Sequence, residues 1–191
     1  MKVRKIVTSN ELKTNTYIID EKFVIDPGKN IGDYINNEII VLLTHAHFDH
    51  IIGLAELKVK ELYIHPLDVE LLRDPQKNFS EYIGSPFSWQ GEWKDITHSF
   101  NILHTPGHTP GSCIIHIENY LFTGDTLFFD SIGRTDLAGS SSEQMKKSLK
   151  TLKEYLLNLP EDTIIAPGHS RTAFLKDLLK VNPYMIFESS I

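Results

Sequence analysis

The sequence predicts a single α/β domain over residues 1–191, because a series of strands is followed by alternating strands and helices. Short β-branched and aromatic segments, separated by turn residues, fill roughly the first forty positions. Later apolar runs of strand length alternate with segments whose apolar residues recur at helical spacing. The 191 residues allow a sizeable core, and 41% hydrophobic with 23% charged residues is ordinary for a globular protein.

Each element follows from a local pattern of this kind. Strands are predicted at Lys2–Thr8, Thr14–Ile19, Phe23–Ile25, Ile39–Leu43, Leu62–His65, Trp93–Thr97, Phe100–Leu103, Cys113–Ile117, Tyr120–Thr123 and Thr163–Ala166. Helices are predicted at Lys29–Asn37, Ile51–Leu57, Pro66–Arg73, Ser142–Asn158 and Arg171–Lys180. The helix at Pro66–Arg73 begins with a proline, which suits a first helical position, and Ser142–Asn158 carries its apolar residues on one face.

Residues 74–92 interrupt the pattern. The segment contains two prolines, two glycines and four aromatic residues, namely Phe79, Tyr82, Phe87 and Trp89. A long loop without its own secondary structure is usually functional or disordered, and the aromatic content argues against disorder. Two interpretations stay open. The loop is a flap over a pocket, or its aromatic residues pack it onto its own domain or onto a subunit partner.

Composition excludes several classes of protein. A net charge of −6 and a pI near 5.8 argue against a general nucleic-acid-binding surface, which would be basic. The single cysteine, Cys113, rules out an internal disulfide framework and is expected to be a core residue. Met1–Val7 has no apolar region of signal-peptide length, and no segment is suited to span a bilayer. We therefore expect a cytoplasmic protein without nucleic-acid or membrane partners.

Three histidines and one aspartate lie within six residues, directly after the apolar run Ile39–Leu43. Neutral imidazole and carboxylate are the usual ligands of zinc and other first-row metals. Without a metal, so many polar groups would be hard to satisfy beside an apolar core. The spacing suits an extended turn better than a helix, on which paired metal-binding histidines stand four apart. The sequence therefore predicts a metal site at His45, His47, Asp49 and His50, and a polar surface loop is the alternative.

Three further side chains of these types follow strands or turns later in the chain. His108 lies in a turn rich in proline and glycine at 104–112, Asp125 follows Tyr120–Thr123, and His169 follows Thr163–Ala166. Strands that end at one edge of a packed sheet bring their following loops together. We expect these three residues to join the first cluster.

The seven residues together resemble the ligand set of the metallo-β-lactamase superfamily. The pattern is His45-x-His47-x-Asp49-His50, followed by His108, Asp125 and His169. The resemblance covers most of the chain and implies an αββα sandwich, with two mixed β-sheets face to face, helices outside and metals at one edge. Residues 105–112 and 123–128 are similar in particular to the type II glyoxalases, the hydroxyacylglutathione hydrolases.

The resemblance implies two divalent cations, with zinc favoured over iron or manganese. His45, His47 and His108 would hold one cation, Asp49, His50 and His169 would hold the other, and Asp125 would bridge them. Two cations about 3.5–4 Å apart can share a hydroxide that forms near neutral pH and attacks a carbonyl carbon. Asp49 and Asp125 are therefore the expected catalytic carboxylates, and no nucleophilic serine or cysteine is required.

Two features depart from the long type II glyoxalases. Few residues follow His169, so the helical C-terminal domain that binds glutathione in those enzymes is expected to be absent. Residues 133–136 read Gly-Arg-Thr-Asp, which resembles short glyoxalase-like bacterial proteins and persulfide dioxygenases. Arg134 is the candidate substrate-binding residue, because a guanidinium can hold an anionic group bidentately. An internal ion pair with Asp130 or Asp136 is its alternative.

The remaining histidines are expected to have lesser roles. His65 and His104 lie near the expected ligands, and each either orients a ligand or is structural. His98 and His116 fall within predicted strands and are expected to be ordinary surface or core positions.

The favoured function is metal-dependent hydrolysis of a thioester of the S-lactoylglutathione type. One alternative is oxidation of a thiol persulfide at a single iron, which His45, His108 and Asp125 would suit. Another is hydrolysis of a different small ester, a lactone or a β-lactam. The expected partner is a small molecule, a thiol adduct, and the chain is expected to be a monomer or a homodimer. Fold alone does not choose among these functions.

Overall fold

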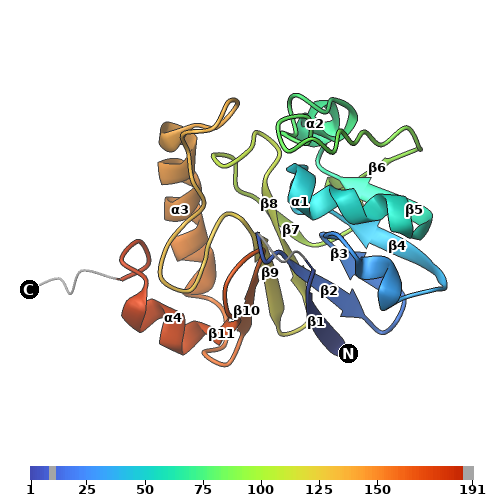
Figure 1. The fold of residues 1–191 in the computed structure, drawn as a ribbon. Coiled ribbons are helices and arrows are strands. Elements are labelled where there is room, and N and C mark those ends of the chain that lie inside the picture. The colour runs from blue at the N-terminus through green and yellow to red at the C-terminus, as the bar shows by residue number, and fades with distance from the viewer. Residues whose placement is uncertain (9–11, 187–191) are drawn as a thin grey trace, which may run out of the picture.

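The computed structural model describes residues 1–8 and 12–186. Its strands form two sheets that pack face to face (Figure 1). The first sheet has the order β1 (Val3–Val7), β2 (Asn15–Ile19), β3 (Phe23–Ile25), β4 (Glu38–Leu42), β5 (Lys58–Ile64), β6 (Lys94–Asp95). The second has the order β11 (Ala173–Phe174), β10 (Ile164–Pro167), β9 (Tyr120–Gly124), β8 (Cys113–Ile117), β7 (Ile102–His104). Both sheets are mixed, since β3 to β6 run parallel and so do β9 and β10.

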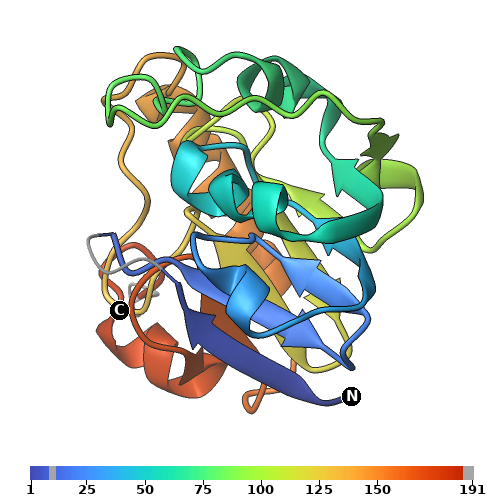
Figure 2. The same cartoon turned by 45° about the vertical axis from the view of Figure 1, so that its right-hand side comes forward.

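Helices cover the outer faces of the two sheets (Figure 2). The first sheet is covered by α1 (Phe48–Ile51), α2 (Val69–Arg73) and the 3-10 turns η1 (Ile31–Asp33), η2 (Ile52–Glu56) and η3 (Pro66–Asp68). The second sheet is covered by α3 (Ser142–Leu156) and α4 (Leu175–Val181). This arrangement confirms the αββα sandwich expected from the sequence. No helix in the described part of the chain is long and apolar enough to cross a membrane.

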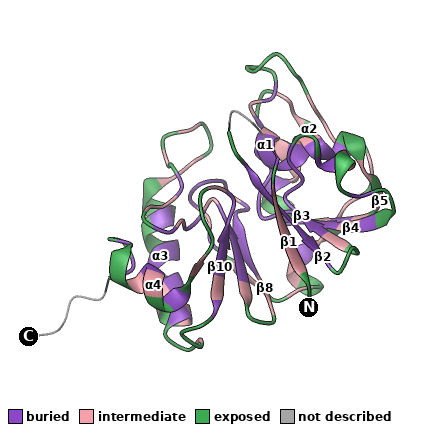
Figure 3. Ribbon diagram, turned by 60° about the horizontal axis from the view of Figure 1, so that its bottom comes forward, coloured by how far each residue is buried: buried purple, intermediate pink, exposed green. Residues whose placement is uncertain are grey.

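The core consists of three apolar layers, which explains why the central strands carry contiguous apolar residues. On β2, Ile18 points into the layer beneath the helices, whereas Tyr17 faces the second sheet. Tyr17 meets Phe122 of β9 edge to face, with ring centroids 5.1 Å apart. On the far side, α3 buries one stripe of its surface, including Leu152, against the second sheet (Figure 3). Because these strands are buried on both faces, their apolar runs do not alternate with polar residues.

Four predicted elements differ from the structure. The helix predicted at Ile51–Leu57 is the 3-10 turn η2, which ends at Glu56. The helix predicted at Arg171–Lys180 begins only at Leu175, because residues 173 and 174 form strand β11 beside β10.

The helix predicted at Lys29–Asn37 is only the 3-10 turn η1, in which the Glu56 carboxylate accepts hydrogen bonds from the Asn30 and Gly32 amides at 2.9 Å. The strand predicted at Trp93–Thr97 ends at Asp95, because the Asp95 side chain accepts a hydrogen bond from the Thr97 amide and starts the 3-10 turn η4 (Ile96–His98). His98 therefore lies on that exposed turn rather than in a strand.

Candidate metal centre

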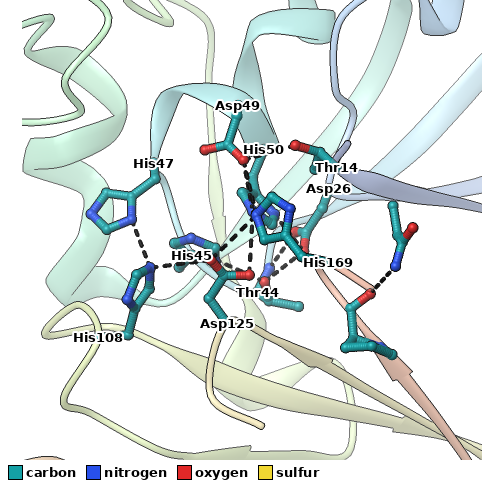
Figure 4. A network of polar contacts seen from close by, with 12 residues as sticks. Thr14, Asp26, Thr44, His45, His47, Asp49, His50, His108, Asp125 and His169 are labelled. Atoms are coloured by element: carbon teal, nitrogen blue, oxygen red, sulfur yellow. Dashed lines mark hydrogen bonds and ion pairs between the residues drawn. The ribbon is translucent and has the colours of Figure 1, made fainter. Parts of the chain in front are cut away.

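The seven predicted ligand residues lie together at one edge of the sandwich, at the ends of β4, β9 and β10 and in the loop between β7 and β8 (Figure 4). His45, His47 and His108 offer ligand atoms within 4.8 Å of one another. A second group with the same spacing comprises Asp49, His50 and His169. The two groups coincide with the two sets that the sequence resemblance implied.

Asp125 lies between the two groups. One carboxylate oxygen, Oδ2, is 3.5 Å from His108 Nε2 and 3.5 Å from His169 Nε2. The other, Oδ1, is 3.5 Å from His50 Nε2. Gly124, immediately before it, has a positive φ of 48° and packs against the Thr44 side chain, so that only glycine allows this turn. The geometry places Asp125 as the residue shared between both groups.

The first ligand cluster is part extended turn and part helix. His47 has an extended backbone and is the N-cap of α1, while Asp49 and His50 lie within that helix. The expectation that an extended turn suits this cluster better than a helix was therefore wrong for Asp49 and His50. A helix start at this point turns two ligands of the second group away from His47 and toward His169, where Asp49 Oδ2 lies 3.2 Å from His169 Nε2.

Asp26 is a buried carboxylate of the site that the sequence analysis missed. Its Oδ1 accepts from the Thr44 amide at 2.8 Å, and its Oδ2 accepts from the Thr44 hydroxyl at 2.6 Å. The same Oδ2 lies 3.1 Å from His50 Nδ1, and Asp26 also groups with His45 and His50. The residue follows strand β3 in a turn, the same context as the recognised ligands, and this position was the signal that could have identified it.

Asp68 fixes the two histidine loops to each other. It is fully buried at the end of η3, and its carboxylate accepts hydrogen bonds from the Ala46 amide, the Thr109 hydroxyl and the Gly111 amide. Ala46 lies between His45 and His47, whereas Thr109 and Gly111 follow His108 in the same turn. Burial raises the pKa of Asp68, although these hydrogen bonds oppose the increase. Asp68 therefore sets the spacing of the first group of histidines.

Main-chain carbonyls orient two of the ligand rings. His108 Nδ1 lies 2.9 Å from the Arg134 carbonyl oxygen, and His169 Nδ1 lies 2.9 Å from the Leu12 carbonyl oxygen. Each contact fixes the ring and directs the other nitrogen, Nε2, toward the site. The Arg134 side chain points elsewhere, because its guanidinium pairs bidentately with Asp136 at 2.7 and 2.9 Å. This is the internal ion pair that the sequence left open, and the backbone contact of Arg134 was not anticipated.

The pKa values of the site residues separate into two classes. Burial lowers the pKa of His45 well below its ordinary value and lowers that of His47 to about 3, so both rings are neutral. Burial also lowers the pKa of His50 and of His169, but the neighbouring carboxylates raise it by more. The pKa of His50 is therefore well above its ordinary value, and that of His169 is about 9. These histidines lower the pKa of Asp125 to about 2, although burial opposes this. At neutral pH, protonated rings therefore neutralise the carboxylates when no cation does.

The donor set fits divalent cations. His45 Nε2, His47 Nε2 and Asp125 Oδ1 are buried polar atoms without a hydrogen-bond partner in the described structure. Buried polar atoms are normally paired, so three unpaired ones that converge are best explained by a missing partner. Imidazole nitrogen and carboxylate oxygen are the ligands that zinc and iron accept.

The comparison with family models agrees with this geometry. Residues 10–169 match the model of the metallo-beta-lactamase superfamily. The chain belongs to the metallo-β-lactamase superfamily. Members of this superfamily bind metal ions, and the clusters of histidine and aspartate described above are this chain's candidates for that role.

Three members of the superfamily illustrate the range of similarity. The hydroxyacylglutathione hydrolase of Shewanella loihica is 36% identical over 159 residues, covering 78% of this chain and 57% of that protein. The crystal structure of BLEG-1 B3 metallo-beta-lactamase superposes with a TM-score of 0.82 at 30% identity, covering 97% of this chain and 100% of that one. The crystal structure of TTHA1623 in a di-iron-bound form superposes with a TM-score of 0.77 at 29% identity, covering 93% of this chain and 98% of that one. This membership supports a metal-dependent hydrolase and does not identify the substrate.

The other histidines of the described chain and Cys113 are not part of the two candidate ligand groups. His65 and His104 stack on each other with ring centroids 4.0 Å apart, and their hydrogen bonds go to the main chain of Leu67 and Pro110. Their role is therefore structural. His116 bonds the Tyr155 hydroxyl at 2.6 Å and so links β8 to α3. Cys113 is fully buried, and burial raises its pKa well above the ordinary value, as expected of a core thiol.

The structure supports one of the two interpretations of the loop at 74–92, packing onto its own domain. Phe87 and Trp89 pack against the apolar layer under the first sheet, which attaches the loop to its own domain. Phe79 instead lies against a ligand, with its ring centroid 5.3 Å from that of His47.

Proposed function

We propose that this chain hydrolyses thioesters with two divalent cations, held by the ligand groups described above. The observation that carries the proposal is the position of Asp125, whose two oxygens lie 3.5 Å from nitrogens of both groups. A carboxylate shared in this way is the arrangement that a pair of cations requires of the protein. The bound pair would supply a hydroxide near neutral pH and polarise the thioester carbonyl.

The residues of the chain have distinct tasks in this reaction. Asp49 is ionised at neutral pH, because His50 and His169 hold its pKa well below the ordinary value although burial opposes them. Its Oδ2 accepts from the Thr14 hydroxyl at 2.8 Å, which fixes the carboxylate in orientation. Asp49 can then accept a proton from the attacking water. Hydrolysis cleaves the carbon–sulfur bond and releases a carboxylic acid and a thiol.

The relatives support hydrolysis but divide over the details. The Shewanella loihica relative is a hydroxyacylglutathione hydrolase, which favours a thioester substrate. BLEG-1 is a metallo-beta-lactamase, and this similarity favours β-lactam hydrolysis as the second candidate. TTHA1623 binds two irons, so iron competes with the zinc that we expected from the sequence. A cytoplasmic location and a monomeric or homodimeric state remain predictions.

The decisive experiment compares substrates under controlled oxygen. Protein purified without added metal is analysed for zinc, iron and manganese, and is then assayed with S-lactoylglutathione, with glutathione persulfide and with a chromogenic cephalosporin. We expect thiol release from S-lactoylglutathione at equal rates with and without oxygen. Oxygen consumption that depends on the persulfide, without thioester cleavage, would replace the proposal with the dioxygenase function. Cleavage of the cephalosporin alone would replace it with the second candidate.

A further inference from the structure

Phe79 places an aromatic ring directly beside the candidate metal centre. Its ring centroid is 5.3 Å from that of His47, at an interplanar angle of 55°. The Tyr82 ring lies 6.1 Å from that of Phe79. Tyr82 is 75% exposed and Ile83 is 50% exposed, at the tip of the same loop. An apolar surface therefore extends outward from the first group of ligands.

The backbone of Phe79 is strained. Its φ is +70°, which places a bulky side chain in the left-handed region that favours glycine, asparagine and aspartate. Among the non-glycine residues with positive φ in the described chain, Phe79 is the only aromatic one. Such strain persists only where the surroundings enforce it, and it is typical of functional positions.

Two buried polar residues enforce this conformation. The side-chain nitrogen of Asn78, Nδ2, donates to the carbonyl oxygens of Leu71 and Phe87, both at 3.0 Å. The side-chain oxygen of Asn78, Oδ1, accepts from the main-chain amide of Ser80 at 2.9 Å. The Asn78 carbonyl also accepts at 2.9 Å from the amide of Phe48, the residue between His47 and Asp49. The loop is therefore bonded to the ligand turn itself, and Phe79 is held in register with His47.

Packing of the loop does not explain the Phe79 ring. Phe87 and Trp89 attach the loop to the apolar layer under the first sheet, whereas Phe79 is not among the residues of that layer. The Phe79 ring contacts two other rings, that of His47 at 5.3 Å and that of Tyr82 in the same loop at 6.1 Å. A strained position that glycine would fill more easily is thus occupied by a ring that lies against the candidate ligand His47.

We propose that Phe79 determines specificity, forming an apolar wall that selects thioesters with an aryl or branched alkyl group near His47. The inference rests on the proposed thioester hydrolysis and names its substrate class. The apolar group belongs either to the acyl side or to the thiol side of the thioester, and the assay separates the two.

The test uses the metal-loaded enzyme and three thioesters. S-lactoylglutathione carries no aryl group, S-mandeloylglutathione carries one on the acyl side, and the lactoyl thioester of benzyl mercaptan carries one on the thiol side. We expect the wild-type chain to have a higher kcat/KM for one aryl substrate than for S-lactoylglutathione. Phe79→Gly should lower that ratio by roughly 2- to 13-fold, the range that corresponds to one aromatic contact.

Thermal stability and a matched control separate specificity from structure. Glu118 also has a positive φ, of +50°, in the exposed turn between β8 and β9, so Glu118→Gly relieves similar strain away from the site. Both variants should keep the wild-type Tm or raise it, and Glu118→Gly should keep the wild-type ratio. An unchanged ratio in Phe79→Gly, or a large fall in its Tm with loss of metal, would overturn the proposal.

If the wild-type enzyme cleaves none of the thioesters, the proposed hydrolysis fails, but the wall can still be tested. The metal-loaded protein is then titrated by calorimetry with benzyl mercaptan and with 2-mercaptoethanol. Tighter binding of the benzyl thiol that is lost in Phe79→Gly would support an apolar wall. Equal binding of the two thiols by the wild-type protein would refute it.

Discussion

At the scale of single residues, the site depends on groups that orient other groups. Asp26 and Thr44 hold the start of the ligand turn, and the Arg134 carbonyl holds the His108 ring. The candidate ligands themselves are common residue types, and what makes them suited to a metal is their fixed positions and the charge balance among them. Substitutions should therefore affect the two ligand groups in distinguishable ways.

Asp125→Asn should weaken metal binding at both groups, because the carboxylate contributes negative charge to each. His169→Gln should weaken only the group of Asp49, His50 and His169. The measurement is metal stoichiometry by elemental analysis after dialysis, with Glu118→Gly as the control. Two cations retained at full occupancy by His169→Gln would contradict the assignment of the ligands.

Arg134→Lys tests the predicted substrate contact against the ion pair with Asp136. If the guanidinium binds an anionic substrate group, KM should rise by roughly ten- to a hundredfold, because one charge-assisted hydrogen bond is worth about 1.5–3 kcal/mol. A lysine cannot reproduce the planar fork. Steady-state kinetics with S-lactoylglutathione give the answer. Unchanged kinetics would leave Arg134 with its main-chain role alone.

At the scale of elements, the site is assembled from loops that follow strands of both sheets. β4 delivers the first cluster, β9 and β10 deliver Asp125 and His169, and the loop after β7 delivers His108. These loops are joined by buried side chains rather than by secondary structure. Asp68 connects two of them, and Asn78 connects the aromatic loop to α1.

Asp68→Asn should separate the two histidine loops. The amide nitrogen of asparagine cannot accept a hydrogen bond, so at least one of the three donors that Asp68 serves loses its acceptor. We expect this loss to lower the free energy of unfolding by about 1.5–3 kcal/mol. Metal affinity at His45, His47 and His108 should fall more than affinity at the other group. Chemical denaturation and metal titration measure the two effects. Asp95→Asn, at another capping carboxylate nearer the surface, is the control and should leave metal binding intact.

At the scale of the whole molecule, the ionisable histidines and aspartates of the metal-free protein lie close together at one edge of the sandwich. The fold brings two protonated histidines against ionised carboxylates, and this pairing contributes to stability in the absence of metal. Stability should therefore depend on pH in a direction that the pKa values determine.

The metal-free protein should lose stability as the pH rises from 6.5 to 9. The pKa of His169 is raised from 6.5 to about 9, so its contribution is complete below pH 6.5 and disappears as the pH passes 9. His50 acts in the same direction. Thermal melts in a chelator should show this fall, and His169→Gln should reduce it. Zinc-saturated protein should not show it, because bound imidazole carries no proton on the ligand nitrogen. A Tm that rises over this range without metal would contradict the prediction.

The sequence alone determined the chemistry of the site and most of the strands. The seven candidate ligands could be named because four apolar runs each lead into a segment that carries histidine or aspartate, and because their order resembles that of the superfamily. Most strands were predicted because their apolar and β-branched residues are contiguous. Lys29–Asn37 and Trp93–Thr97 failed because Glu56 and Asp95 act through contacts that a propensity pattern does not contain.

Only the tertiary structure decided which side chains orient the ligands. Asp26 precedes Thr44 by 18 residues, and their contact exists only once β3 and β4 pair. Asp68 precedes Gly111 by 43 residues, and their contact exists only once the two sheets pack. The position of Phe79 beside His47 likewise depends on the buried hydrogen bonds of Asn78. Local sequence specifies which groups can bind a cation. The distances that make them one site depend on long-range packing, because no short segment of the chain contains both partners of these contacts.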